Sequence, residues 1–168
     1  MRSTAKWLAI LFVAVGLCAS GAARSDEHAE HAAKLPPGPI RDRHDLMKGM
    51  GEQAQGINDA FNMGAGEGFD TGIIQRYAQA IGESAHQIPS LFPKGSTNPN
   101  SRALPAIWDH WDTFTKLATQ LEDQAQSLAR AAGSGNDENL HEKAKKMFGT
   151  CKSCHEQFRR PEDKKKGQ

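Results

Sequence analysis

Apolar residues recur at intervals of three and four positions in four stretches of the chain, which places them on one face of an α-helix in each stretch. We therefore expect helices over about 40–63, 69–88, 107–132 and 140–158. The four apolar faces are, in order, Ile40, Met47, Met50, Ala54, Ile57 and Phe61; Phe69, Ile73, Tyr77, Ile81 and Ile88; Ile107, Trp111, Phe114, Ala118, Leu121, Ala125, Leu128 and Ala132; and Leu140, Ala144, Met147, Cys151, Cys154 and Phe158. None of the stretches has the strict alternation typical of a strand.

The connections between these stretches indicate how the helices are arranged. Short glycine-containing segments, 64–66 and 132–136, separate the first pair and the last pair of helices, and short connections join antiparallel neighbours. The middle connection, 89–105, is long and rich in Pro, Asn and Ser, and a loop of that length in a compact domain is often functional. The sequence predicts an all-α fold over 39–161: an antiparallel up-down-up-down four-helix bundle.

The first residues have the composition of an export signal. Arg2 and Lys6 precede an apolar run that includes Cys18, and small residues follow at 19–23. We expect residues 1–23 to be a signal peptide, which implies export to the periplasm. Residues 24–38 are expected to be a flexible lead-in, where His28 and His31 alone make a poor metal site. Residues 162–168 are expected to be a basic tail.

The charge pattern argues against a nucleic-acid partner. Without the signal peptide the chain has 19 basic and 20 acidic residues, and phosphate binding needs an excess of Lys and Arg. From Lys143 onward, however, nine basic residues face three acidic ones. This excess can steer an acidic partner toward the C-terminal end. It can equally be a solvated helix end whose cations complement the helix dipole.

The fourth stretch carries Cys151-Lys-Ser-Cys154-His155, and the spacing Cys-x-x-Cys-His is typical of c-type haem attachment. On a helix that turns by about 100° per residue, Cys154 and His155 lie on either side of Cys151, so all three side chains project toward one flat group. The two thiols can add to the two vinyl groups of a haem while the imidazole binds its iron. The motif predicts one covalently bound haem c.

Three other uses of the cysteine pair fit the sequence less well. A redox dithiol places its first cysteine at a helix N-terminus, whereas Cys151 falls in the last turns of its helix. A structural zinc site needs four ligands, commonly from two such pairs. A plain disulfide, which an oxidising compartment permits, leaves His155 without a role.

The other side of the iron is expected to face the first helix. Met47 and His155 lie about 12 Å and 9 Å, respectively, from the helix ends that meet at one end of the bundle, at 1.5 Å rise per residue. Met47 is therefore predicted to be the sixth ligand, and Met/His ligation suits electron transfer. The alternative is that Met47 only fills the core. Arg43 and Arg159 are the expected partners of the haem propionates, with Arg102 a further candidate.

Three segments resemble the class II cytochromes c, a family that includes cytochrome c'. They are Arg43-His-Asp-Leu-Met47-Lys-Gly-Met-Gly51, Arg102-Ala-Leu-Pro-Ala-Ile-Trp108 and Cys151-Lys-Ser-Cys154-His155-Glu-Gln-Phe158-Arg159. The resemblance implies haem linkage to Cys151 and Cys154, His155 as the proximal ligand and Met47 on the distal side. It also places Arg43 on the propionate side. His44 stands where relatives often have Gln, so that hydrogen bond does not carry over.

Members of this family differ in function at the distal position. Those with a methionine ligand are six-coordinate, low-spin electron carriers, whereas cytochromes c' proper are five-coordinate and bind small gases such as nitric oxide. We expect a periplasmic electron carrier that is not an enzyme, with redox proteins and the haem-attachment machinery as partners, as a monomer or homodimer. The alternative functions are a gas-binding cytochrome c' and a haem-free helical interaction protein.

Overall fold

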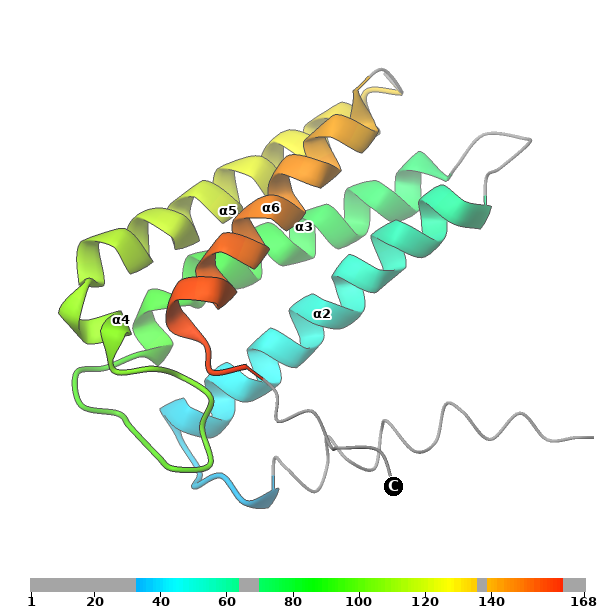
Figure 1. Cartoon of the computed structure of the whole chain (residues 1–168). Coiled ribbons are helices and arrows are strands. Elements are labelled where there is room, and N and C mark those ends of the chain that lie inside the picture. The colour runs from blue at the N-terminus through cyan, green and yellow to red at the C-terminus, as the bar shows by residue number, and fades with distance from the viewer. Residues whose placement is uncertain (1–32, 64–69, 136–138, 162–168) are drawn as a thin grey trace, which may run out of the picture.

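The chain folds into an antiparallel bundle of helices (Figure 1). The structure, a computed structural model, describes residues 33–63, 70–135 and 139–161. Its bundle helices are α2 (Pro39–Met63), α3 (Thr71–Gln87), α5 (Trp111–Gly133) and α6 (Leu140–Phe158), with η1 (Pro89–Leu91) and α4 (Ala106–Asp109) between α3 and α5. Within these ranges there is no strand, so the predicted all-α bundle is confirmed. The expected signal peptide, the paired histidines 28 and 31, the first short connection and the basic tail lie outside the described residues.

The ends of the helices follow from local chemistry. Gly38 takes a positive φ of 97° just before α2, and Pro39 begins the helix, where its missing N–H costs nothing. The Asp70 carboxylate accepts a hydrogen bond from the Ile73 N–H at 3.0 Å and so caps α3. Ahead of α2, in the segment expected to be flexible, Leu35 is buried and its carbonyl accepts a hydrogen bond from Arg41.

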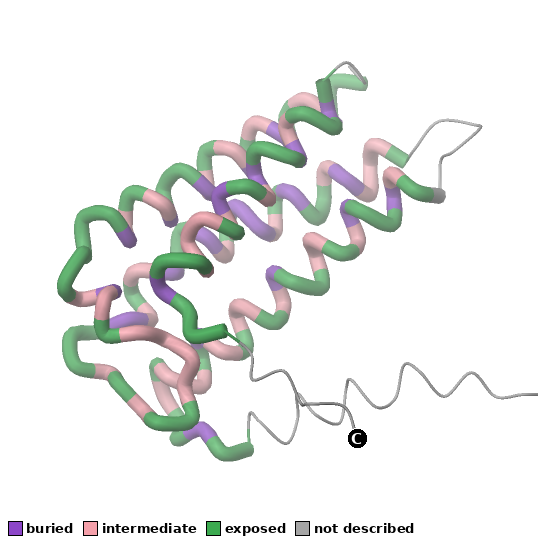
Figure 2. Tube along the Cα trace, viewed as in Figure 1, coloured by how far each residue is buried: buried purple, intermediate pink, exposed green. Residues whose placement is uncertain are grey.

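Buried positions run along the inner side of every bundle helix (Figure 2). The predicted faces of the third and fourth stretches largely coincide with them. On the first face only Met50 and Ile57 are buried, and on the face of α3 Ile81 and Ile88 are buried but Tyr77 is not. Ile74, Ala78 and Ile81 are buried, whereas the predicted Tyr77 is 38 % exposed. The buried side of this part of α3 is therefore that of Ile74 and Ala78, and the Tyr77 ring lies against Gly56 of α2.

The third stretch is also interrupted where the sequence predicted continuity. His110 has non-helical backbone angles (φ −123°, ψ 46°), so α4 ends at Asp109 and α5 begins at Trp111. Trp111 was predicted on the apolar face, but it is 36 % exposed. The Trp108 indole N–H instead points to the long connection and donates to the carbonyls of Phe92 (3.1 Å) and Pro93 (3.2 Å).

The helices are not packed equally against one another. α3 packs against both α2 and α5, and α5 packs against α6, but α2 and α6 make few close backbone contacts. The last two meet through side chains at one end, where the Phe61 and His141 rings stack with centroids 4.1 Å apart. The α2–α6 side of the bundle is therefore held together mainly through α3 and α5. Among the described helices, none has both the length and the apolar character needed to cross a membrane.

Two glycines of α2 allow the α2–α3 packing to be tested. A methyl group at Gly56 would lie 2.4 Å from Tyr77 Cε2, whereas one at Gly51 would have no neighbour within 4 Å. We expect Gly51→Ala to stabilise the protein by about 0.5–1 kcal/mol through helix propensity. We expect Gly56→Ala to lose that gain and to destabilise by about 1 kcal/mol, because the ring must move. Chemical denaturation of both variants measures the difference, and equal stabilities would contradict the proposed contact.

Candidate haem-binding site

The orientation of α6 is determined by its apolar face. Leu140, Ala144 and Met147 are buried, as is Phe158, whose ring packs edge-on to Phe114 with centroids 5.5 Å apart. Half-buried on the adjoining face are the three motif residues, Cys151, Cys154 and His155. The structure therefore brings the predicted motif residues together on one side of one helix, at the border of the core.

A buried polar contact with α5 also fixes α6, and the sequence analysis missed it. Thr150 is only 4 % exposed, and its hydroxyl donates to Gln124 Oε1 at 2.8 Å. The Gln120 amide donates to the same hydroxyl oxygen at 3.3 Å. Because Thr150 directly precedes Cys151, these hydrogen bonds hold the rotation of α6 at the start of the motif. Nothing in the sequence indicated that Thr150 would be buried, because it is a polar residue in a stretch that contains several lysines.

The two thiols are free and are held in their protonated form. Burial raises the pKa of both cysteines, and the pKa of Cys154 rises to about 11, with the neighbouring Cys151 adding to the effect. Redox dithiols work the opposite way, since their reactive cysteine has a lowered pKa. The electrostatics of the pair therefore disfavour the redox-dithiol alternative.

His155 is held in its neutral form. Burial lowers the pKa of its imidazole first, and the positive charges of Arg159 and Arg102 lower it further. A neutral imidazole keeps a lone pair, which is the form that ligates metals. The guanidinium of Arg159, predicted to contact a propionate, is thus close enough to His155 to act on it electrostatically, although the residue itself is exposed.

Met47 lies in the first half of α2, whose start lies at the end of the bundle where α6 finishes (Figure 1). It is half-buried against the edge of the core, whereas Met50, one turn later, is 8 % exposed and belongs to the core. Of these two methionines, Met47 is therefore the one that is only partly enclosed by protein.

Arg43, the predicted propionate partner, is hydrogen-bonded to the long connection. Its Nη1 donates to Ser96 Oγ (2.8 Å) and to the Leu91 carbonyl (3.5 Å), and its Nη2 donates to the Ser96 carbonyl (2.7 Å) and Ser101 Oγ (3.2 Å). The guanidinium also lies 4.6 Å from the centre of the Phe92 ring. Both terminal nitrogens are thus hydrogen-bonded to the long connection.

The donors left over nevertheless fit a haem c. Arg43 Nε is buried and has no hydrogen-bond partner within the part of the chain that the structure describes. Such an orphaned donor is unfavourable unless an acceptor, such as a carboxylate, completes it. Together with two free thiols and a neutral imidazole on one helix face, it provides the set of groups that a covalently bound haem requires.

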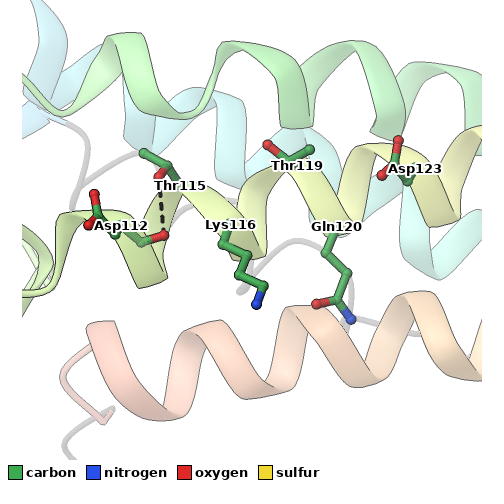
Figure 3. Close-up of a pocket in the computed structure, with 6 residues that line it drawn as sticks. All are labelled: Asp112, Thr115, Lys116, Thr119, Gln120 and Asp123. Atoms are coloured by element: carbon green, nitrogen blue, oxygen red, sulfur yellow. Dashed lines mark hydrogen bonds between the residues drawn. The ribbon is translucent and has the colours of Figure 1, made fainter.

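A shallow hollow on α5 lies away from these residues. It has a volume of about 510 Å³ and is bounded by Asp112, Thr115, Lys116, Thr119, Gln120 and Asp123 (Figure 3). All six side chains come from α5, with Lys116 and Gln120 pointing toward α6, and none of the predicted site residues borders the hollow (Figure 3). The hollow is therefore not the cofactor site.

The fold and the motif define a helical-bundle protein with a haem-attachment sequence on its last helix. The model of the family described as Cytochrome C' matches residues 38–159, and the chain belongs to this cytochrome c' family, whose members bind covalently attached haem c. It is 34 % identical over 122 residues to a cytochrome c' of Rhodopseudomonas palustris, covering 71 % of this chain and 80 % of that one. It is also 30 % identical over 122 residues to a cytochrome c-556 of Agrobacterium tumefaciens, covering 73 % and 97 %.

The solved structures agree with this assignment. The structure of cytochrome c' from Rhodopseudomonas palustris superimposes with a TM-score of 0.65 at 30 % identity, over 76 % of this chain and all of that one. The fold, the family and the haem c cofactor that the sequence predicted are thereby confirmed.

The raised thiol pKa gives a prediction for the folded, haem-free chain. At pH 8 a thiol of pKa about 11 is ionised to roughly one part in a thousand, so we expect Cys154 to react with iodoacetamide about a hundredfold more slowly than a thiol of ordinary pKa near 9. The rate should rise about tenfold per pH unit up to pH 11. Mass spectrometry of the alkylated peptide measures it, with the guanidinium-unfolded chain as the control. Equal rates in a chain that is helical by circular dichroism would contradict the burial.

Proposed function

We propose that Cys151 and Cys154 each form a thioether with one vinyl group of the haem, and that His155 is the proximal ligand. The support is that the three side chains share one face of α6, with protonated thiols and a neutral imidazole. When bound, the iron supplies one-electron and gas-binding chemistry. The protein supplies an apolar surround, a proximal ligand and, through Arg43 Nε, a donor for a propionate.

We infer that the protein is a gas-binding haem protein of the cytochrome c' type, with small diatomic molecules such as nitric oxide as its ligands. The observation that carries this proposal is the match of the Cytochrome C' family model across the whole bundle. The weak contact between α2 and α6 supports it, because a small ligand needs space on the α2 side of the haem. A non-enzymatic role is consistent with this function.

A second candidate function, single-electron transfer with His/Met ligation, rests on Met47. Its side chain is half-buried on α2, and the rise per residue puts it near the level of His155 on α6. A methionine ligand opposite histidine raises the reduction potential, which suits an electron carrier. The relatives named cytochrome c-556 and cytochrome c-554 are similar to this chain over the same helices.

Export to the periplasm is part of the proposal. The apolar run that follows Arg2 and Lys6 supports a signal peptide, and covalent haem attachment to a Cys-x-x-Cys-His motif requires a dedicated attachment machinery. A redox protein with an acidic surface fits the basic residues that begin at Lys143. Such a partner suits both candidate functions, because the iron of a gas-binding protein also exchanges electrons.

The visible spectrum of the reduced protein tests the proposed function directly. We expect a high-spin spectrum that shifts on addition of carbon monoxide or nitric oxide, with the haem remaining on the chain under denaturing mass spectrometry. A low-spin spectrum that carbon monoxide leaves unchanged would overturn gas binding in favour of electron transfer. A chain without covalent haem would overturn both.

Substituting Met47 and Met50 of α2 in turn separates the two functions at a single residue. If gas binding is the function, Met47→Leu keeps the high-spin spectrum, because leucine fills the same volume without ligating. If Met47 is a ligand, the same variant changes from low-spin to high-spin and begins to bind carbon monoxide. Met50→Leu is the matched control, since Met50 is buried in the core, and it should alter neither spectrum by more than a few nanometres.

A further inference from the structure

The long connection between α3 and α4 contacts both α2 and α6, two helices that make few close contacts with each other. We call residues 91–104 the strap; in Figure 1 it lies beside the start of α2 and the end of α6. On the α6 side it is held by backbone hydrogen bonds: the Leu104 N–H donates to the Phe158 carbonyl at 3.0 Å, and the Arg160 N–H donates to the Arg102 carbonyl at 2.8 Å. Ala103 and Arg159 form an isolated antiparallel bridge there.

On the α2 side the strap is held by Arg43. This side chain is 3 % exposed, and it is the one charged residue that is buried among those the structure describes. Burying a guanidinium is unfavourable unless it is hydrogen-bonded, and bonds from a charged donor are stronger than neutral ones. Four such bonds reach Leu91, Ser96 and Ser101, so the cation is stable only while the strap is in place.

The two anchors lie next to the residues that face the haem from either side. Met47 follows Arg43 by four positions, one helical turn, and His155 precedes Phe158 by three. The close backbone contacts between α2 and α6 are few, and the stacking of Phe61 on His141 lies at the opposite end. At the haem end the strap is therefore the structural connection between the two helices.

We propose that the strap, clamped by Arg43, sets the separation between Met47 and His155 and so controls how readily a small ligand reaches the α2 side of the haem. Arg43 is in this view a positioning residue. It acts through the strap, in addition to any contact of its Nε with a propionate. The inference rests on the proposed haem site and deepens it.

The decisive variant leaves Arg43 in place and removes its side-chain acceptors. Ser96→Ala combined with Ser101→Ala removes two of the four hydrogen bonds and leaves the arginine free to meet a propionate. Ser90→Ala is the matched control, because the Ser90 hydroxyl donates only to the Gln87 carbonyl, outside the strap. Arg43→Gln removes the whole clamp and should act in the same direction more strongly.

Two measurements on the haem-loaded protein carry the test. Hydrogen exchange of the Leu104 amide reports on the strap without using the haem, and we expect it to be about tenfold faster in the double variant. Carbon monoxide association with the reduced protein, followed after flash photolysis, is expected to be about tenfold faster as well. Ser90→Ala should change neither.

The outcomes separate this inference from the proposed function. Faster exchange with an unchanged association rate would make the strap merely structural and overturn the inference, as would unchanged exchange. A wild-type protein that excludes carbon monoxide contradicts gas binding, but the inference still stands if the double variant then admits it. If neither protein binds carbon monoxide while the strap is loosened, the inference fails.

Discussion

The burial of one positive charge is the constraint on which the haem end of this bundle depends. A four-helix bundle closes most simply by packing each helix against its two neighbours, but α2 and α6 make few close backbone contacts with each other. Here α2 and α6 are joined indirectly, through α3 and α5 and through the strap. Arg43 strengthens the connection through the strap, because a desolvated guanidinium stabilises only the arrangement that satisfies its donors.

Much of this architecture is local and could therefore be predicted from the sequence. Helices α2 and α6 begin and end within a residue or two of the expected positions, since their apolar residues keep one periodicity and their ends carry Pro39 and the motif. The haem-attachment motif could equally be predicted from the sequence, because its chemistry needs particular residue types at a fixed spacing. The prediction that Met47 stands at the level of His155 rests on the rise per residue and the antiparallel order of the helices.

The errors arise where partners are distant in sequence. Ile73 and Ile74 are both apolar, so periodicity alone could not decide which of them faces inward. The structure buries Ile74 and places the Tyr77 ring against Gly56 of α2, outside the core. The break at His110 has no Pro or Gly to announce it. The partners of Arg43 lie 48 to 58 residues away in a stretch without periodicity, so the sequence predicted an arginine beside the site but not what it binds.

The relation between the two candidate functions follows from the same geometry. A methionine side chain is unbranched and adaptable, so Met47 can lie near an iron without being committed to it. Shifting a two-state equilibrium from one per cent to ninety-nine per cent takes about 5.5 kcal/mol. A few hydrogen bonds from a charged donor are of that order. Gas binding and electron transfer can therefore differ by how firmly α2 is held rather than by which residue stands opposite His155, and the element that holds α2 at that level is the strap.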